Sequence, residues 1–234
     1  MVRAPLAQRL LDALPQTQCT RCGYPDCEAY ASAIAAGQAA VNRCPPGGAE
    51  GMARLAAIAD VPCPTAIDAH CGTESPRTVA WIDENWCIGC TLCIKACPTD
   101  AIIGSHKRMH TVIEPYCTGC ELCVPVCPVD CIQLDNVSGK ATGWAAWSDE
   151  QADEARTRYA ARQLRLARES VEHAARLEAR AREKLAALQA HTHGAAGGTG
   201  GSTEESDGGA EAARKRAIIE AALARAAKAR SGQR

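Results

Sequence analysis

The stretch that decides the fold is Cys87-Ile-Gly-Cys90-Thr-Leu-Cys93-Ile-Lys-Ala-Cys97-Pro98, which recurs thirty residues later as Cys117-Thr-Gly-Cys120-Glu-Leu-Cys123-Val-Pro-Val-Cys127-Pro128. A repeat of this kind is typical of two similar structural units packed together. Short apolar runs flank each copy, and we expect strands at 79–83 and 109–113 before the cysteines and at 101–104 and 131–134 after them. The repeat therefore predicts a small β-α-β type of unit, used twice.

The cysteine spacing in each copy suits a cubane 4Fe–4S cluster, which needs one thiolate at each of its four irons. Three closely spaced cysteines wrap around one face of the cluster, and in the bacterial two-cluster pattern the last cysteine of each run ligates the other cluster. Four-thiolate zinc sites are the alternative, but they usually pair two C-x2-C knuckles. We predict one cluster on Cys87, Cys90, Cys93 and Cys127, and another on Cys97, Cys117, Cys120 and Cys123.

A second cysteine pattern, C-x2-C-x4-C-x16-C, lies near the N-terminus. An Ala-rich helix over about 28–38 would carry the last of these cysteines back to the first three. The spacing alone leaves zinc and a cubane cluster both open. The candidate ligands are Cys19, Cys22, Cys27 and Cys44.

Three further cysteines fall outside these patterns. Cys131 aligns with Ala101 in the repeat, which favours a small buried hydrophobic residue over a ligand. Cys63 and Cys71 lie eight residues apart in a Pro-containing connector. We expect unpaired thiols there, with a metal site or a regulatory disulfide as the alternative.

Composition excludes several classes of protein. Aromatic residues are 3% of the chain and Phe is absent, which argues against a large aromatic core. No apolar run approaches the ~20 residues of a membrane span, and no signal peptide is visible. Fifteen cysteines in such a chain indicate metal or cluster ligands in a reducing cytosol. We find neither a dinucleotide fingerprint nor a P-loop, so we expect a non-catalytic electron carrier.

Charge and composition divide the chain. Residues 1–150 hold 10 Lys and Arg against 16 Asp and Glu and contain every cysteine, whereas the final 24 residues hold seven basic against two acidic residues. A stretch free of Gly and Pro that starts at Ser148 predicts a helix. We predict an N-terminal 4Fe–4S domain at 1–60, a connector at 61–77, a two-cluster domain at 78–137, a charged helix at 148–190, a Gly-rich and disordered linker at 191–210, and a basic Ala-rich helix at 211–234.

The two-cluster segment resembles a bacterial-type ferredoxin, and its surroundings resemble the B subunit of Rnf/Rsx-type electron transport complexes. The likeness is carried by DENWCIGC at 83–90, MHTV at 109–112 and LPQTQ at 14–18. It spans roughly residues 10–137 and implies an α+β protein: a small helical 4Fe–4S domain, a ferredoxin-like two-cluster unit and three clusters in all. Most members of the family begin with a membrane-spanning anchor, whereas eighteen residues precede Cys19 here.

The resemblance implies a relay of electrons through three 4Fe–4S clusters, as a subunit of or donor to an ion-translocating oxidoreductase complex. The expected partners are redox proteins, including membrane-embedded subunits, and not nucleic acid. The expected location is the cytoplasm, peripheral on the cytoplasmic face of the inner membrane. Two alternatives are a free soluble ferredoxin that serves cytosolic enzymes, and a structural or nucleic-acid adaptor that uses metal staples and the basic tail. Either electron carrier should show a reversible low-potential redox couple, whereas the adaptor should not.

Overall fold

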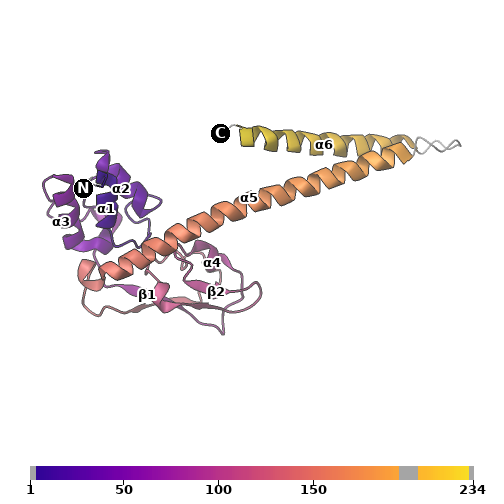
Figure 1. The fold of residues 1–234 in the computed structure, drawn as a ribbon. Coiled ribbons are helices and arrows are strands. Elements are labelled where there is room, and N and C mark those ends of the chain that lie inside the picture. Colours follow the sequence, from indigo (N-terminus) through magenta and orange to yellow (C-terminus); the bar gives the residue numbers. More distant parts are fainter. Residues whose placement is uncertain (1–3, 195–204, 232–234) are drawn as a thin grey trace. The chain divides into compact units, whose positions relative to one another are not determined.

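The computed structural model describes residues 4–194 and 205–231 of the chain (Figure 1). The chain divides into two compact units, of which the first ends at Gln163 and the second begins at Leu164. The first unit holds all the cysteines and mixes helices with two small sheets, which confirms the α+β prediction. Its helices are α1 (Leu6–Asp12), α2 (Cys27–Ala35), α3 (Gly48–Ala59), α4 (Leu92–Ala96) and the start of α5 (Asp149–Gly194), with short 3-10 turns at Pro45–Gly47, Ala69–Cys71, Glu114–Tyr116 and Gly143–Ala146.

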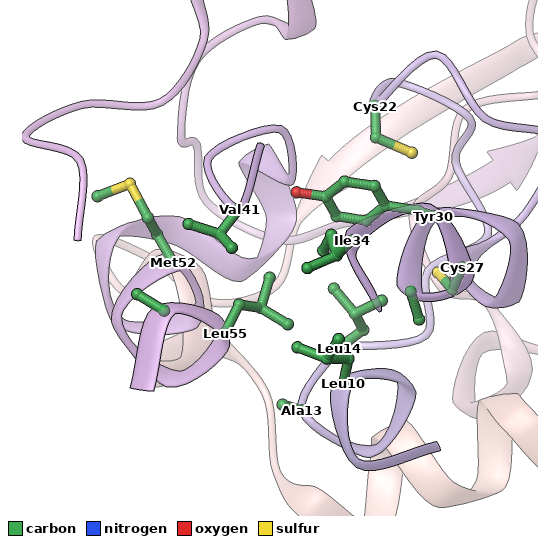
Figure 2. Close-up of a cluster of buried hydrophobic side chains, with 12 residues drawn as sticks. Leu10, Ala13, Leu14, Cys22, Cys27, Tyr30, Ile34, Val41, Met52 and Leu55 are labelled. Atoms are coloured by element: carbon green, nitrogen blue, oxygen red, sulfur yellow. The ribbon is translucent and has the colours of Figure 1, made fainter. Parts of the chain in front are cut away.

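Helices α1, α2 and α3 enclose an apolar core in the N-terminal part (Figure 2). Leu10 and Leu14 come from α1 and the turn after it, and they meet Tyr30 of α2 and Leu55 of α3 with at most 1% of each side chain exposed. Each large apolar side chain buried to this degree stabilises the folded state by about 1.5–3 kcal/mol. This core fixes the start of α2, on which Cys27 lies.

A single connector carboxylate joins the N-terminal part to the segment after the repeat. Glu74 accepts hydrogen bonds from the Ala49 N–H at the start of α3 (2.9 Å) and from the Thr142 hydroxyl (2.6 Å). A negative side chain is favourable at a helix N-terminus, where backbone N–H groups lack partners. Gly48 leaves the necessary room, because a Cβ there would lie 2.5 Å from the Glu74 carboxyl carbon.

The repeat forms two antiparallel pairs of strands, and each pair joins one half of the repeat to the other. Strand β1 (Thr78–Ile82) pairs with β4 (Ile132–Asn136), and β2 (Ile102–Gly104) pairs with β3 (His110–Val112). The strand before each cysteine run therefore pairs with the strand after the other run. This exchange carries the last cysteine of each run toward the other half.

The two halves differ in the segment after the third cysteine. In the first half, the Lys95 N–H donates to the Thr91 carbonyl at 3.2 Å within the short helix α4. Pro125 occupies the equivalent position in the second half and has no N–H to donate. Only turns follow Cys123 for this reason.

Helix α5 begins with reciprocal capping. The Ser148 hydroxyl accepts from the Gln151 N–H (3.2 Å), and the Gln151 side chain accepts from the Ser148 N–H (3.0 Å). In the second unit α5 continues to Gly194 and α6 covers Glu205–Ser231, so helix occupies both ends of the predicted linker. Residues 195–204 of that linker and 232–234 of the last predicted segment lie outside the described residues. Across the described ranges, we find no helix with the length and apolar character needed to span a bilayer.

Candidate metal centres

Four N-terminal cysteines gather from three elements. Cys19 and Cys22 lie in the loop before α2, Cys27 is the first residue of α2, and Cys44 precedes the turn at Pro45–Gly47. Burial raises the pKa of Cys27, and the charges of Cys19 and Cys22 raise it further. Burial likewise raises the pKa of Cys44, with contributions from Cys27 and Cys19. These mutual effects on the pKa values indicate that the four thiols lie near one another.

Two buried glutamines hold the first loop of this site. The Gln18 side-chain oxygen accepts from the Cys27 N–H at 2.9 Å, and its amide donates to Gln16 at 3.3 Å. Both side chains are at most 3% exposed. Sequence reasoning used these residues only for family likeness and missed their role in the site. Their one signal is the polar run before Cys19, which does not indicate burial.

In the ferredoxin unit, four cysteines line one cavity. Cys117, Cys120 and Cys123 come from the second half, and Cys97 reaches them from the first. Burial raises the pKa of both Cys120 and Cys123 to about 12, and the charge of Cys97 adds to both shifts. The other lining residues are largely apolar, among them Ala80, Ala101, Ile102 and Val112.

The remaining four ligand candidates lie around the other end of the repeat. Burial raises the pKa of Cys93 to about 11, and the charges of Cys90 and Cys87 contribute. Burial acts to raise the pKa of Cys127 as well, but N–H groups that include those of Val129 and Cys131 outweigh it and lower that pKa. Cys131 lies beside both Cys127 and Cys87. Cys127, the last cysteine of the second run, is therefore close to the first loop.

Backbone geometry in the two loops fits a negatively charged cluster. Gly89 and Thr91 adopt left-handed conformations, with φ of 68° and 65°, and Gly119 and Glu121 repeat them at 64° and 64°. Alternating left-handed residues turn successive N–H groups toward one side and form hollows that bind anions, including iron–sulfur clusters.

The donor set also fits clusters. A buried thiolate needs cationic compensation, because desolvation otherwise keeps the thiol protonated. Iron bound to four thiolates would supply that compensation. Within the ranges that the structure describes, no three His, Cys, Asp or Glu side chains converge closely enough to hold a single metal ion.

Three cysteines remain outside these groups, and two of them lie in the connector. Cys63 is exposed, while Cys71 is buried and raises the pKa of the neighbouring Arg43. The structure has both as free thiols. Cys131 is 6% exposed, in agreement with a buried position. Its thiol also touches a predicted ligand, which the alignment with Ala101 did not reveal.

The two ferredoxin loops have different surroundings. In the second loop (117–123), the Thr118 hydroxyl donates to the Thr17 carbonyl at 3.0 Å in a buried contact, and Glu121 pairs with Arg21 at 2.7 Å. In the described part of the chain, the apolar side chains at and next to the first loop (87–93) are left largely exposed. Ile88, at the position equivalent to Thr118, is 56% exposed, and the preceding Trp86 is 69% exposed.

The start of α5 contacts both halves of the repeat and the N-terminal part. Arg158 stacks over the Tyr116 ring, and Tyr159 donates to Asp26, the N-cap of α2, at 3.0 Å. Arg162 pairs with Asp100 at 3.3 Å. Basic side chains of α5 thus lie on the acidic, cysteine-bearing part of the same unit.

A paired-strand repeat with two sets of four cysteines defines the chain as an iron–sulfur protein of the ferredoxin type. Comparison with known families agrees: a 4Fe-4S dicluster domain model matches residues 80–134, and a putative Fe-S cluster model matches residues 14–46. The chain belongs to the B-subunit family of ion-translocating oxidoreductase complexes, which confirms the predicted resemblance.

Two relatives show the extent of the match. The B subunit of the complex in Azoarcus sp. strain BH72 is 55% identical over 140 residues, which are 60% of this chain and 76% of that protein. Its counterpart in Alkalilimnicola ehrlichii is 53% identical over 154 residues, which are 65% of this chain and 81% of that protein. No solved structure matches the chain.

Proposed function

We propose that the chain relays electrons through three 4Fe–4S clusters as the B subunit of an ion-translocating oxidoreductase complex. Family membership supports the role, and the cysteine geometry supports the number of clusters. The proposed ligands are Cys19, Cys22, Cys27 and Cys44 for the N-terminal cluster, Cys87, Cys90, Cys93 and Cys127 for the first-loop cluster, and Cys97, Cys117, Cys120 and Cys123 for the second-loop cluster.

One observation carries the relay: the N-terminal cysteine loop touches the second ferredoxin loop. The Thr17–Thr118 hydrogen bond joins residues two positions before Cys19 and one position after Cys117. The rate of electron tunnelling falls steeply with distance, so direct contact between ligand-bearing loops favours transfer. The second-loop cluster is therefore the neighbour of the N-terminal cluster in the proposed path.

The other end of the path lies at the exposed first loop. Trp86, Ile88 and Leu92 are each at least 42% exposed beside Cys87, Cys90 and Cys93. Exposed aromatic and aliphatic groups of this kind mark interaction sites, and aromatic residues contribute strongly to protein interfaces. We assign this surface to a redox partner within the complex. Each bound cluster accepts and releases one electron, and the chain performs no bond chemistry.

The first test is the metal content of the full chain after anaerobic purification. Three cubane clusters give about twelve iron and twelve acid-labile sulfide per chain, without zinc. About eight of each with one zinc would make the N-terminal site a structural staple and would remove it from the relay. Co-purification with membranes that contain the other subunits tests complex membership, and its absence would favour a free ferredoxin.

A further inference from the structure

The two ferredoxin loops meet different side chains at equivalent positions. His110 on β3 has its Nδ1 atom 3.3 Å from the Cys93 sulfur. The repeat has an offset of thirty residues. The residue equivalent to His110 is therefore Ala80, and the residue equivalent to Cys93 is Cys123. The second loop therefore has a methyl group at the position from which an imidazole contacts the first loop.

Strand pairing shows that this difference is built into the sheets. His110 lies opposite Gly104, and a Cβ at Gly104 would lie 2.2 Å from the His110 ring. In the equivalent pair, the residue that corresponds to His110 is the small Ala80 on β1, and the residue opposite it is the larger Leu134 on β4. His110 is 1% exposed, and its Nε2 atom has no hydrogen-bond partner among the described residues. The Cys93 sulfur is thus the polar contact that satisfies the ring at Nδ1.

A second difference occurs at the crossing cysteines. The Ala101 N–H donates to the Cys97 sulfur at 3.2 Å, and the Cys131 N–H is among the groups near Cys127 that lower the pKa of that thiol. In addition, the Cys131 sulfur lies 3.5 Å from the Cys127 sulfur. Ala101 offers only a methyl group at this position. The thiol contact exists in one half. In the other half the Thr99 hydroxyl lies 3.8 Å from the Cys97 sulfur, but it donates its hydrogen to the Tyr116 carbonyl at 2.8 Å.

We propose that His110 and Cys131 are positioning residues that raise the reduction potential of the first-loop cluster above that of the second-loop cluster. The inference rests on the proposed ligand sets. As ligands, Cys93 and Cys127 are thiolates, so the imidazole N–H and the S–H must donate to them. Donors to ligand sulfur stabilise the more negative, reduced form, and this is a principal means by which proteins set such potentials.

The consequence concerns where an electron resides. The second loop contacts the N-terminal domain, while the first loop is exposed. A higher potential at the first-loop cluster holds the electron at the end of the unit that a partner can reach.

Two mirror-image variants test the proposal in the full chain. Cys131→Ala gives the second half the residue that the first half has at this position, and Ala101→Cys does the reverse. An EPR-monitored redox titration should show two ferredoxin couples at different potentials in the unaltered protein. Cys131→Ala should lower the higher couple, and Ala101→Cys should raise the lower one. Each shift should change the ratio of reduced to oxidised cluster about tenfold at a fixed ambient potential, or about 59 mV for one electron.

Variants of His110 separate donation from packing. His110→Leu should lower the same couple as Cys131→Ala, and His110→Gln, which keeps an N–H donor, should restore part of the shift. Iron and sulfide content shows whether each variant is loaded. If His110→Leu does not take up its clusters, the potentials of Cys131→Ala and Ala101→Cys provide the test. Unchanged potentials in fully loaded Cys131→Ala and Ala101→Cys would overturn the inference, whereas an unaltered chain with far fewer than eight iron atoms would instead overturn the proposed function.

Discussion

The first loop (87–93) and the second loop (117–123) share one cysteine spacing but have different environments. The second is held against the N-terminal domain by Thr118 and Glu121. The first leaves Trp86 and Ile88 largely in solvent. Ligand spacing determines what kind of group a loop can hold, whereas the residues between the ligands determine which surface faces a partner. One repeat can therefore serve an inward-facing and an outward-facing site.

The largest expected effect comes from removing the N-terminal cluster. Cys44→Ser should reduce iron by about four atoms per chain and stop transfer from one outside partner to the other, because the N-terminal cluster is one end of the proposed path. The ferredoxin clusters should retain their EPR signals. The measurement is the transfer rate beside metal content.

Cys63→Ser is the matched control, since Cys63 is exposed and lies outside the three proposed ligand sets. It should change neither iron content nor rate. Electron transfer at the full rate in Cys44→Ser would show that the N-terminal cluster is not on the path. The contact between the second loop and the N-terminal domain would then have a structural role only.

The helical difference between the halves predicts the next effect. Lys95→Pro should destabilise the protein by about 3 kcal/mol, because it removes the bond to the Thr91 carbonyl and introduces a clash in α4. Pro125→Lys should have little effect, because no helix exists there to be broken. Denaturant unfolding of the two variants measures the contrast, and equal losses of stability would contradict it.

Exchanging the equivalent residues of the loops should produce a smaller change. Thr118→Ile places the first-loop residue in the covered site, leaves the Thr17 carbonyl unpaired and should lower the free energy of unfolding by roughly 1–3 kcal/mol. Ile88→Thr should stay within about 0.5 kcal/mol, as exposed substitutions usually do. Comparable losses from both would show that the cover over the second loop adds no stability.

Part of this comparison follows from the sequence. The repeat and the cysteine spacing predict the fold class, and the four strands lie within two residues of the predicted ranges. Pro125 already indicates that the second half cannot copy α4. These features depend on residues close together in the chain, where spacing and backbone chemistry decide the structure.

Other features depend on contacts between distant residues, which spacing does not encode. The bond between Thr118 and Thr17 joins residues 101 positions apart. A histidine on a strand gives no sign that it contacts a ligand, and His110 reaches Cys93 only because β2 and β3 pair in the observed register. Gln16 and Gln18 are polar residues buried by their hydrogen bonds, which hydrophobic patterning cannot identify.

The smallest expected effect concerns the exposed face of the first loop. Trp86→Ala should slow electron transfer to membranes carrying the rest of the complex about tenfold at limiting concentration, because an aromatic anchor at an interface often contributes about 1.4 kcal/mol or more. Stability should change little, since Trp86 is 69% exposed. The equivalent Tyr116 lies under Arg158, so Tyr116→Ala should reduce stability instead. A dependence of the rate on protein concentration separates docking from transfer: a Trp86→Ala defect that disappears at saturation places the loss in docking. A defect that persists at saturation, or none at all, would mean that the exposed loop is not where the partner binds.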